Sequence, residues 1–249
     1  MRAPRALTST GRDSQPRWSP DGRTLAFVRR PEGEGKPQLH LLPLEQGGES
    51  RALTTLLGGA SSPAWSPDGS RVAFLSGHDP ELDTPDRVKP KHEPGRIVTQ
   101  PVFRWNDQGF VDHDHLDHLW VVEVATGTTR QLTRGKQFSE GAPSWSRDGR
   151  QLLYLTDRRP EPWFGVPSED PDLRAIAVDL ASPSDGSDAL LAADVSGPLD
   201  AFVQAPDGRI AAVGVHLSGA PRSYDQRELL LFEGAWPQTA PRVLTAGLD

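Results

Sequence analysis

Cysteine is absent from the 249 residues of this chain, and so is any long apolar run. Without cysteine, the chain has neither a disulfide framework nor a thiolate metal site. No stretch approaches the roughly 18 consecutive apolar residues that a membrane helix requires, so no membrane partner is expected. The opening residues, MRAPRALTST, lack the apolar core of a secretory signal peptide, which predicts a cytoplasmic location.

An excess of positive charge is also missing. The formal net charge is −7 and the isoelectric point is near 5.5. Binding to the phosphates of nucleic acid requires a basic protein surface, so this balance argues against a nucleic-acid partner. What the chain does contain is 24 proline and 24 glycine residues, spread along its length. That distribution favours many short elements joined by turns over long helices.

One short pattern recurs and decides the expected fold. The chain reads PRWSPDGRTLAFVRR at 16–30, PAWSPDGSRVAFLSG at 63–77 and PSWSRDGRQLLYLTD at 143–157, with a weaker copy, VQAPDGRIAAVGV, at 203–215. Proline presets the second position of a type I turn, aspartate favours the third, and glycine supplies the positive φ of the fourth. Each copy therefore predicts a tight hairpin turn that leads into a strand.

The strand after the first turn is apolar on both of its faces. Leu25 and Phe27 lie on one face, and Ala26 and Val28 lie on the other, so the strand is expected to lie between two layers. Further strands follow in every unit, and the same four-strand pattern occurs four times. The sequence therefore predicts an all-β fold, a β-propeller of four-stranded blades with about four blades present. The expected blades cover approximately 13–54, 60–133, 140–195 and 200–245 of a single domain, 1–249.

The repeated residues are interpreted as structural. Each tryptophan would wedge between neighbouring sheets, and each aspartate would close its turn rather than act as a catalytic carboxylate. One aspartate per turn supplies too few oxygens for a calcium site of about 6–8 ligands. The tryptophans are Trp18, Trp65 and Trp145, and the aspartates are Asp21, Asp68, Asp148 and Asp207.

The loops between the second and third strands are much longer than the Asp-Gly turns. Alternating strand directions place all of these loops on one face, so the propeller is expected to have one plain face and one decorated face. Loops on a rigid scaffold commonly carry binding sites. The four loops are 29–38, 77–117, 157–172 and 216–227.

The longest insert, 77–117, belongs to blade two. It contains RIVTQPVFRWNDQGFV, which predicts an extra hairpin with its turn at NDQG. Arg96 and Arg104 are the candidate substrate-binding residues, because a guanidinium group can bind a carboxylate through two hydrogen bonds. Alternatively, both arginines are solvated or pair with nearby aspartates.

The stretch DHDHLDH, from Asp112 to His118, raises the question of a metal site. His113 and His115 would share one strand face, with carboxylates nearby. The sequence places no third ligand, and an exposed hairpin end often carries such residues. No metal and no cofactor are therefore predicted.

The insert and the strand after it resemble the propeller of acylaminoacyl-peptidases, a branch of the prolyl oligopeptidase superfamily of serine peptidases. The matching residues are Arg96-Ile97, Arg104-Trp105, Gly109-Phe110 and His118-Leu119-Trp120. The resemblance covers essentially the whole chain and implies a larger ring, usually of seven blades, of which four would be present. Tol-type propellers share the WSPDG and LT repeats, so a free-standing interaction propeller without enzymatic role is the alternative.

The resemblance also implies an α/β-hydrolase domain with a Ser-Asp-His triad, its nucleophile on a G-x-S-x-G elbow. No serine here has glycine at both flanking positions, so that catalytic domain is interpreted as absent and no catalytic residue is assigned. The expected function is the substrate-gating propeller portion of a peptidase that acts on short peptides, inactive by itself. Expected partners are the hydrolase domain, the remaining blades and a peptide, together with self-association through the uncovered apolar faces of blades one and four.

Overall fold

The computed structural model describes residues 6–45, 49–84, 104–105, 109–110, 112, 114–135, 138–157, 172–178, 189–192, 199–215, 227–233 and 241–245. Within these residues the backbone forms 18 strands and no helix, which confirms the all-β prediction. The described part of the chain accordingly contains no helix with the length and apolar character needed to cross a membrane.

Sixteen of the strands form four antiparallel sheets of four strands each. Sheet one contains β1 (Asp13–Trp18), β2 (Thr24–Arg29), β3 (Gln38–Pro43) and β4 (Arg51–Ala52). Sheet two contains β5 (Ser61–Trp65), β6 (Arg71–Ser76), β9 (His118–Glu123) and β10 (Thr129–Gln131). Sheet three contains β11 (Glu140–Trp145), β12 (Gln151–Thr156), β13 (Asp172–Ala177) and β14 (Ala189–Ala192). Sheet four contains β15 (Leu199–Gln204), β16 (Ile210–Gly214), β17 (Glu228–Phe232) and β18 (Arg242–Val243).

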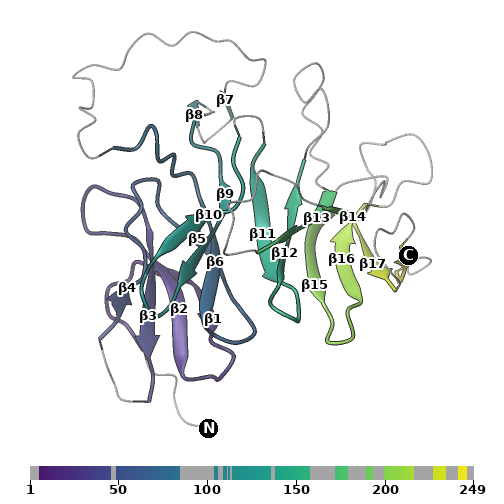
Figure 1. Ribbon diagram of the computed structural model, residues 1–249, viewed down its shortest axis with the longest axis horizontal. Helices are drawn as coiled ribbons and strands as arrows, with labels where there is room; N and C mark the ends of the chain where they lie inside the picture. Colours follow the sequence, from purple (N-terminus) through teal and green to yellow (C-terminus); the bar gives the residue numbers. More distant parts are fainter. Residues whose placement is uncertain are drawn as a thin grey trace.

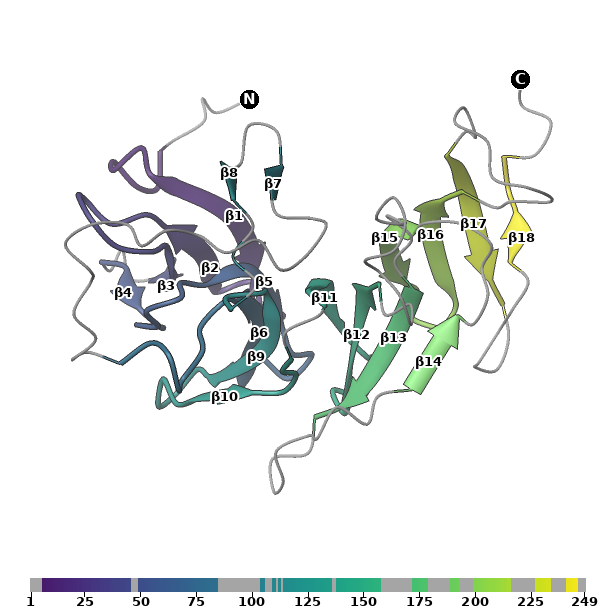
Figure 2. The same cartoon turned by 90° about the horizontal axis from the view of Figure 1, so that it is seen from above.

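The four sheets follow one another along an arc, and the first strands β1, β5, β11 and β15 lie along its inner side (Figure 2). Each sheet keeps its strands in chain order, which is the arrangement of propeller blades. Between β6 and β9 the chain makes an excursion that contains a separate two-stranded pair, β7 (Arg104–Trp105) with β8 (Gly109–Phe110). This pair lies at the opposite edge from the Asp-Gly turns (Figure 1).

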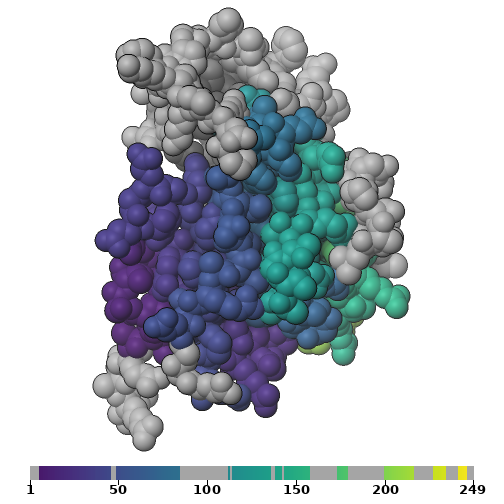
Figure 3. All heavy atoms as spheres, turned by 60° about the vertical axis from the view of Figure 1, so that its left-hand side comes forward, coloured from purple at the N-terminus to yellow at the C-terminus, as the bar shows by residue number. Residues whose placement is uncertain are grey.

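Neighbouring sheets share buried hydrophobic clusters. Val28 and Leu39 of sheet one belong to one cluster with Val72 and Phe74 of sheet two. Equivalent clusters join sheet two to sheet three and sheet three to sheet four. Sheets one and two form one continuous surface in the space-filling view (Figure 3). The core is therefore divided into layers between sheets, which explains why the second strands are apolar on both faces.

Hydrogen bonds explain why serine, aspartate and glycine recur in the turns. Ser19 Oγ donates to Asp21 Oδ1 at 2.6 Å and accepts the backbone N–H of Thr24 at 2.9 Å. Asp21 Oδ1 also accepts the backbone N–H of Arg23 at 3.0 Å, while Gly22 takes a φ of +70°. The same bonds recur in sheets two and three around Ser66 with Asp68 and Ser146 with Asp148.

The fourth turn differs from the other three. Ala205 replaces the serine, so the hydroxyl that holds the far end of the turn is missing. The turn is also one residue shorter: Gln204 pairs with Ile210, whereas Trp18 pairs with Leu25. The weaker sequence copy is thus a shorter turn with fewer hydrogen bonds.

An extra residue bulges from the first strand of sheets one and two. The register of β1 shifts between Ser14 and Arg17, and Gln15 takes a positive φ of 52°. Ser62 of β5 takes the same φ, and its backbone N–H donates to Gln15 Oε1 at 2.6 Å. Proline follows each of these residues, which a bulge tolerates because it needs no N–H in the ladder. The two bulges therefore link sheets one and two at the inner side of the arc.

The recurring Leu-Thr pair ends the fourth strand in a consistent way. The threonine hydroxyl accepts a backbone N–H from the third strand, so it continues the ladder beyond the last backbone bond. The three bonds are Leu39 N to Thr54 Oγ1 at 3.0 Å, Leu119 N to Thr133 Oγ1 at 2.9 Å, and Leu229 N to Thr245 Oγ1 at 3.1 Å.

Two of the three repeated tryptophans lie between sheets, and the third does not. Trp65 Nε1 donates to the carbonyl of Arg17 at 3.1 Å, and Trp145 Nε1 donates to the carbonyl of Ala64 at 2.9 Å. Trp145 is 7% exposed, whereas Trp18 is 60% exposed. The indole of Trp18 has no such carbonyl partner among the described residues, because no sheet precedes sheet one within them.

The uncovered face of sheet one is less apolar than its sequence predicts. Phe27 lies on the side of β2 that faces away from sheet two, and it is nevertheless buried. The guanidinium carbon of Arg29 lies 5.0 Å from the centre of its ring, and Asp13 holds that guanidinium through two bonds of 2.7 and 2.9 Å. A cation over the ring thus replaces an apolar neighbour.

Candidate functional site

The candidate site lies where the insert leaves and rejoins sheet two. β6 ends at Ser76 and β9 begins at His118, and residues 77–84 and 114–117 extend from these two ends. The two segments approach closely at Gly77, because a Cβ atom there would lie 2.6 Å from the carbonyl oxygen of His115. Glycine is therefore needed for the insert to start and finish side by side.

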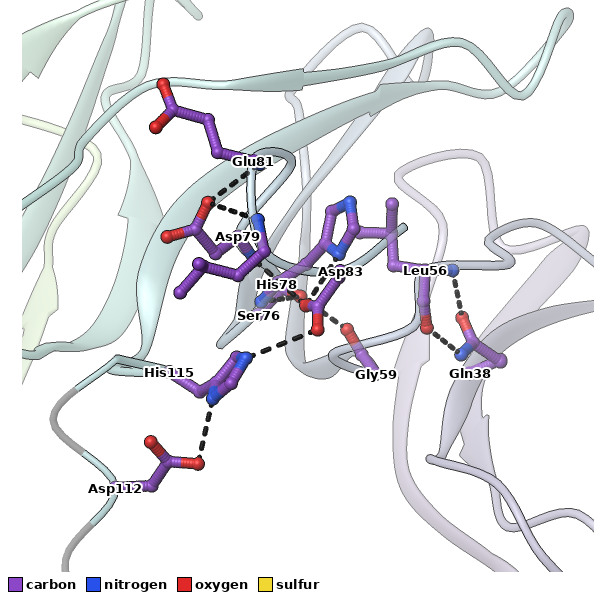
Figure 4. A network of polar contacts seen from close by, with 11 residues as sticks. Gln38, Leu56, Gly59, Ser76, His78, Asp79, Glu81, Asp83, Asp112 and His115 are labelled. Atoms are coloured by element: carbon purple, nitrogen blue, oxygen red, sulfur yellow. Dashed lines mark hydrogen bonds and ion pairs between the residues drawn. The ribbon is translucent and has the colours of Figure 1, made fainter. Parts of the chain in front are cut away.

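Two histidines and two aspartates join the ends of the insert (Figure 4). His115 Nδ1 lies 2.8 Å from Asp112 Oδ2, and His115 Nε2 lies 3.2 Å from Asp83 Oδ1. The other oxygen of Asp83 lies 3.0 Å from His78 Nδ1 and accepts the backbone N–H of Asp79, also at 3.0 Å. We call His78, Asp83, Asp112 and His115 the insert clasp.

The geometry of the insert clasp favours a protonated His115. Both of its ring nitrogens face carboxylate oxygens, which only accept hydrogen bonds, and a neutral imidazole has a single N–H. Burial by itself lowers the pKa of His115, but the hydrogen bonds and negative charges of Asp112 and Asp83 outweigh it, so the pKa lies above its usual value.

Asp83 is correspondingly held in its ionised form. Burial by itself raises the pKa of Asp83, whereas the N–H of Asp79, the His78 ring and the charge of His115 lower it, and the net pKa lies below its usual value. The insert clasp is thus an imidazolium between two carboxylates, with His115 and Asp83 half-buried and Asp112 exposed.

A second histidine–carboxylate pair lies at the start of β9 and is buried. His118 Nδ1 lies 2.8 Å from Glu140 Oε2, and His118 Nε2 donates to the carbonyl of Gly135 at 2.9 Å. The hydroxyl of Thr133 donates to the same Glu140 oxygen at 2.9 Å. Burial lowers the pKa of His118, but the hydrogen bond and charge of Glu140 outweigh it and raise the pKa above its usual value. Because this pair ties sheet two to sheet three, we interpret it as structural.

An open pocket of about 420 Å³ adjoins the insert clasp. Its walls come from the outgoing end of the insert, with His78, Asp79 and Glu81, and from the end of sheet two, with His118 and Arg134. Arg134 brings a guanidinium group and Asp79 and Glu81 bring carboxylates, so the lining carries charges of both signs. Such a lining can hold the polar and charged groups of a peptide.

The structure places only some of the residues that the sequence singles out. Arg104 lies in β7 and pairs through its backbone with Phe110, while its side chain lies outside what the structure describes. Arg96 and His113 fall outside the described residues. The arginine pair and its role in substrate binding stay predictions.

Three of the four described histidines contact carboxylates through their rings, whereas the ring of His40 packs against Phe27. His78, His115 and His118 each have an aspartate or glutamate partner. Across the described ranges, no group of three or more His, Asp or Glu side chains is arranged to hold a metal ion. Through ion pairs and hydrogen bonds, these residues can bind polar and charged groups.

Sequence reasoning did not single out His78, Asp83 or Glu140. A signal for the first two is present, because GHDPELD at 77–83 and DHDHLD at 112–117 place histidine and aspartate at both ends of one insert. If the two ends of the insert meet, their histidines and aspartates come close enough to pair. Glu140 carries no such signal, since it lies 22 residues beyond His118, in the next sheet.

Comparison with known proteins finds a sequence relative among the peptidases. No family model matches it. Over 146 residues it is 36% identical to a protein of Bacillus subtilis (strain 168) described as uncharacterized peptidase YuxL. That match covers 57% of this chain and 22% of the Bacillus protein, so the chain spans less than a quarter of its relative's length.

Three solved structures share the fold at low sequence identity. Acylaminoacyl peptidase from Pyrococcus horikoshii matches with a TM-score of 0.60 and 16% identity over 95% of this chain and 32% of that chain. TolB from Acinetobacter baumannii matches with a TM-score of 0.57 and 15% identity, over 96% and 45%. The β-propeller domain of the Trilobed protease from Pyrococcus furiosus matches with a TM-score of 0.51 and 15% identity, over 94% and 57%. The propeller fold is confirmed, and the resemblance to acylaminoacyl-peptidases extends to the structure.

Proposed function

We propose that this chain is the substrate-gating propeller portion of a serine peptidase of the acylaminoacyl-peptidase type, acting on short peptides. The observation that carries the proposal is the 36% identity to a Bacillus peptidase over 146 residues. The propeller fold and its likeness to an acylaminoacyl peptidase support it. The residues of the insert that resemble this family, Arg104-Trp105 and His118-Leu119-Trp120 among them, point the same way.

In this proposal the propeller binds and selects, and a separate hydrolase domain supplies the Ser-Asp-His triad. A ring of rigid blades admits a short or unfolded peptide and excludes a folded protein. The pocket on the decorated face offers the groups that would hold the peptide. Arg134 would bind a carboxylate, and Asp79 or Glu81 would bind an ammonium group. The remaining blades and the hydrolase domain are the proposed partners.

A second candidate is an interaction propeller of the Tol type with no enzymatic role. The likeness to TolB, which extends over 96% of this chain, favours it. The two proposals differ in one testable property, because only the first requires a reactive serine in the polypeptide that carries this sequence.

The test captures that polypeptide from its source with antibodies raised against this chain and exposes it to a serine-directed fluorophosphonate probe. We expect the native polypeptide to be labelled and to hydrolyse acylated short peptides, and the isolated 249-residue chain to remain unlabelled. A native polypeptide without labelling would contradict the peptidase proposal and favour the Tol type. Labelling of a serine within the isolated chain would contradict the assignment of catalysis to a separate domain.

A further inference from the structure

The insert has two ends, and the outgoing end, residues 77–84, is fixed to the sheets. The hydroxyl of Ser76, which is buried, donates to the carbonyl of Gly59 at 2.6 Å (Figure 4). Glycine at position 58 permits close backbone contact, because a Cβ atom there would overlap the backbone of His78. The start of the insert therefore packs against the connection between sheets one and two.

The returning end, of which residues 112 and 114–117 are described, reaches this fixed end through a side chain. His115 Nε2 lies 3.2 Å from Asp83 Oδ1, across the base of the insert (Figure 4). Within the returning end, His115 Nδ1 lies 2.8 Å from Asp112 Oδ2. The other oxygen of Asp112 accepts the backbone N–H of Asp114 at 3.2 Å. His115 thus links a fixed segment to a segment that is organised around Asp112.

Both ends supply walls of the open pocket. The outgoing end contributes Asp79, and the returning end contributes Asp114 and Leu116. Asp83, the partner of His115 across the base, accepts the backbone N–H of Asp79 at 3.0 Å. The width of the pocket between these walls therefore depends on how far apart the two ends lie.

We propose that the insert clasp is a pH-sensitive switch that sets the width of this pocket. While His115 is charged, it holds the returning end against the outgoing end. When His115 loses its proton, the bond to Asp83 is lost and the returning end moves away from the outgoing end, so the pocket widens. This inference goes beyond the proposed function and does not depend on it, because the switch operates in the chain without a substrate.

The number of N–H groups on the ring explains why the link breaks. A neutral imidazole has one N–H, so it can donate to only one of its two carboxylates, and it presents a lone pair to the other. The N–H stays with Asp112, which is the nearer partner. Asp83 keeps two other contacts, with the His78 ring and the backbone N–H of Asp79, so it can release His115 and remain paired.

The titratable groups that face His115 come from the two ends of the insert. Asp112 lies on its own end and Asp83 on the other, with the ring of His78 on the far side of Asp83. The connection at 53–60, against which the outgoing end packs, carries no charged residue. At the start of β9, the buried histidine is paired with a glutamate of sheet three.

These surroundings decide the direction of the switch. Burial lowers the pKa of His115, but its two carboxylates outweigh burial and hold the pKa above the usual value of about 6.5. The link is therefore complete below that usual value and is lost as the pH rises through the folded pKa. The returning end is held on the acidic side and released on the alkaline side.

Methyl NMR of the 249-residue chain follows the two ends separately, because Leu116 belongs to the returning end and Leu82 to the outgoing end. Relaxation of the methyl carbons is the readout, since it reports motion directly, whereas the charge of a nearby ring shifts the resonances of both ends. From pH 6 to pH 9, the ratio of released to held form at Leu116 should rise about tenfold or more, the effect of one charge-assisted hydrogen bond. Its midpoint should coincide with the titration of the His115 ring, and Leu82 should not change.

Two histidine variants identify the group responsible. His115→Gln has an amide that donates from one end only, so Leu116 should be mobile at both pH values. His40→Gln is the matched control, because His40 is a partly buried histidine of β3 outside the insert clasp, and it should keep the pH dependence. Motion of Leu116 that does not change with pH, an equal change at Leu82, or a pH dependence that persists in His115→Gln would each overturn the proposal.

Discussion

Single indole N–H groups connect neighbouring sheets of this protein. Trp65 and Trp145 each donate to a backbone carbonyl of the preceding first strand. Arg71 adds to the second of these contacts, because its guanidinium carbon lies 4.8 Å from the centre of the Trp145 ring. The repeated tryptophan therefore contributes a directed hydrogen bond in addition to apolar surface.

Replacing Trp145 by phenylalanine removes that hydrogen bond and keeps most of the apolar contact. We expect the free energy of unfolding to fall by about 1 kcal/mol, which is typical of one intramolecular hydrogen bond. Urea denaturation measures the change. Trp18→Phe is the control, examined at a concentration where the chain is monomeric, and it should have little effect. Equal losses in both variants would contradict a role for the indole N–H.

The Asp13–Arg29 pair adds a pH-dependent contribution to stability. The hydrogen bond from Arg29 outweighs the effect of burial and lowers the pKa of Asp13 to about 2. A folded-state pKa below the unfolded value of about 3.9 means that the stabilisation is present above about pH 4 and is lost as the pH falls toward 2. Because Arg29 also covers Phe27, the pair protects an apolar residue as well.

We expect Asp13→Asn to lower the free energy of unfolding by about 1 kcal/mol at pH 7, because the pair is half-buried and doubly hydrogen-bonded. The difference from the unmodified chain should narrow as the pH is lowered to 3. Urea denaturation at several pH values provides the measurement. Glu32→Gln is the control, since Glu32 contacts Arg12 at an exposed position and should show no such trend. A difference that stayed constant with pH would contradict the assignment.

At the scale of elements, ionised side chains join the two described ends of the insert. The insert clasp joins residues at the two ends of a long excursion from sheet two. The adjoining pocket shares His78 with the clasp. The pocket and the insert clasp therefore have one side chain in common.

The insert clasp should weaken as the pH rises. The folded pKa of His115 lies above the usual value of about 6.5, so its contribution is complete below that pH and is lost as the pH rises through the folded pKa. NMR titration of the histidine rings measures this pKa directly. Asp112→Asn should lower the pKa of His115, because it removes one of the two negative charges on the ring.

His40 is the internal reference for this titration. Burial and the charge of Arg29 lower its pKa, and Asp112 is not among the groups that shift it. We expect His115 to titrate at a higher pH than His40, and only His115 to respond to Asp112→Asn. A His115 pKa at or below that of His40 would refute the charged clasp.

At the scale of the whole molecule, rigid sheets carry a decorated edge. The Asp-Gly turns and the inter-sheet clusters fix the arc, while β7 and β8 of the insert lie at the edge opposite those turns (Figure 1). The proposed gating function requires this division, because only a rigid propeller can exclude large substrates by their size. Substrate contacts are then expected from the decorated edge, where Arg104 lies in β7.

In the longer peptidase that we propose, Arg104→Ala should raise KM for short peptides by about tenfold or more, the effect of losing one charge-assisted hydrogen bond. Stability should hardly change, because β7 and β8 form a separate pair outside the four sheets. Steady-state kinetics and thermal unfolding provide the two readouts. Arg23→Ala, which removes an exposed arginine of the first Asp-Gly turn at the opposite edge, is the control. Unchanged kinetics with a lowered melting temperature would make Arg104 structural.

The sequence by itself determined the features that depend on residues close together in the chain. Asp21 and Gly22 form the predicted turn because its hydrogen bonds span only a few residues. The two-sided apolar pattern of the second strands predicted burial between layers, and Ala26 and Val28 are buried in this way. Four repeats of this local pattern were sufficient to predict a propeller.

Tertiary structure decided which distant groups meet. Asp83 and His115 lie 32 residues apart and become partners only because the ends of the insert are brought together beside Gly77. Trp18 has the same sequence context as Trp145, yet it is exposed because its burial depends on a preceding sheet and not on its own strand. Local hydrogen bonding repeats wherever its motif repeats, but burial and charge pairing depend on which neighbour the fold brings to that surface.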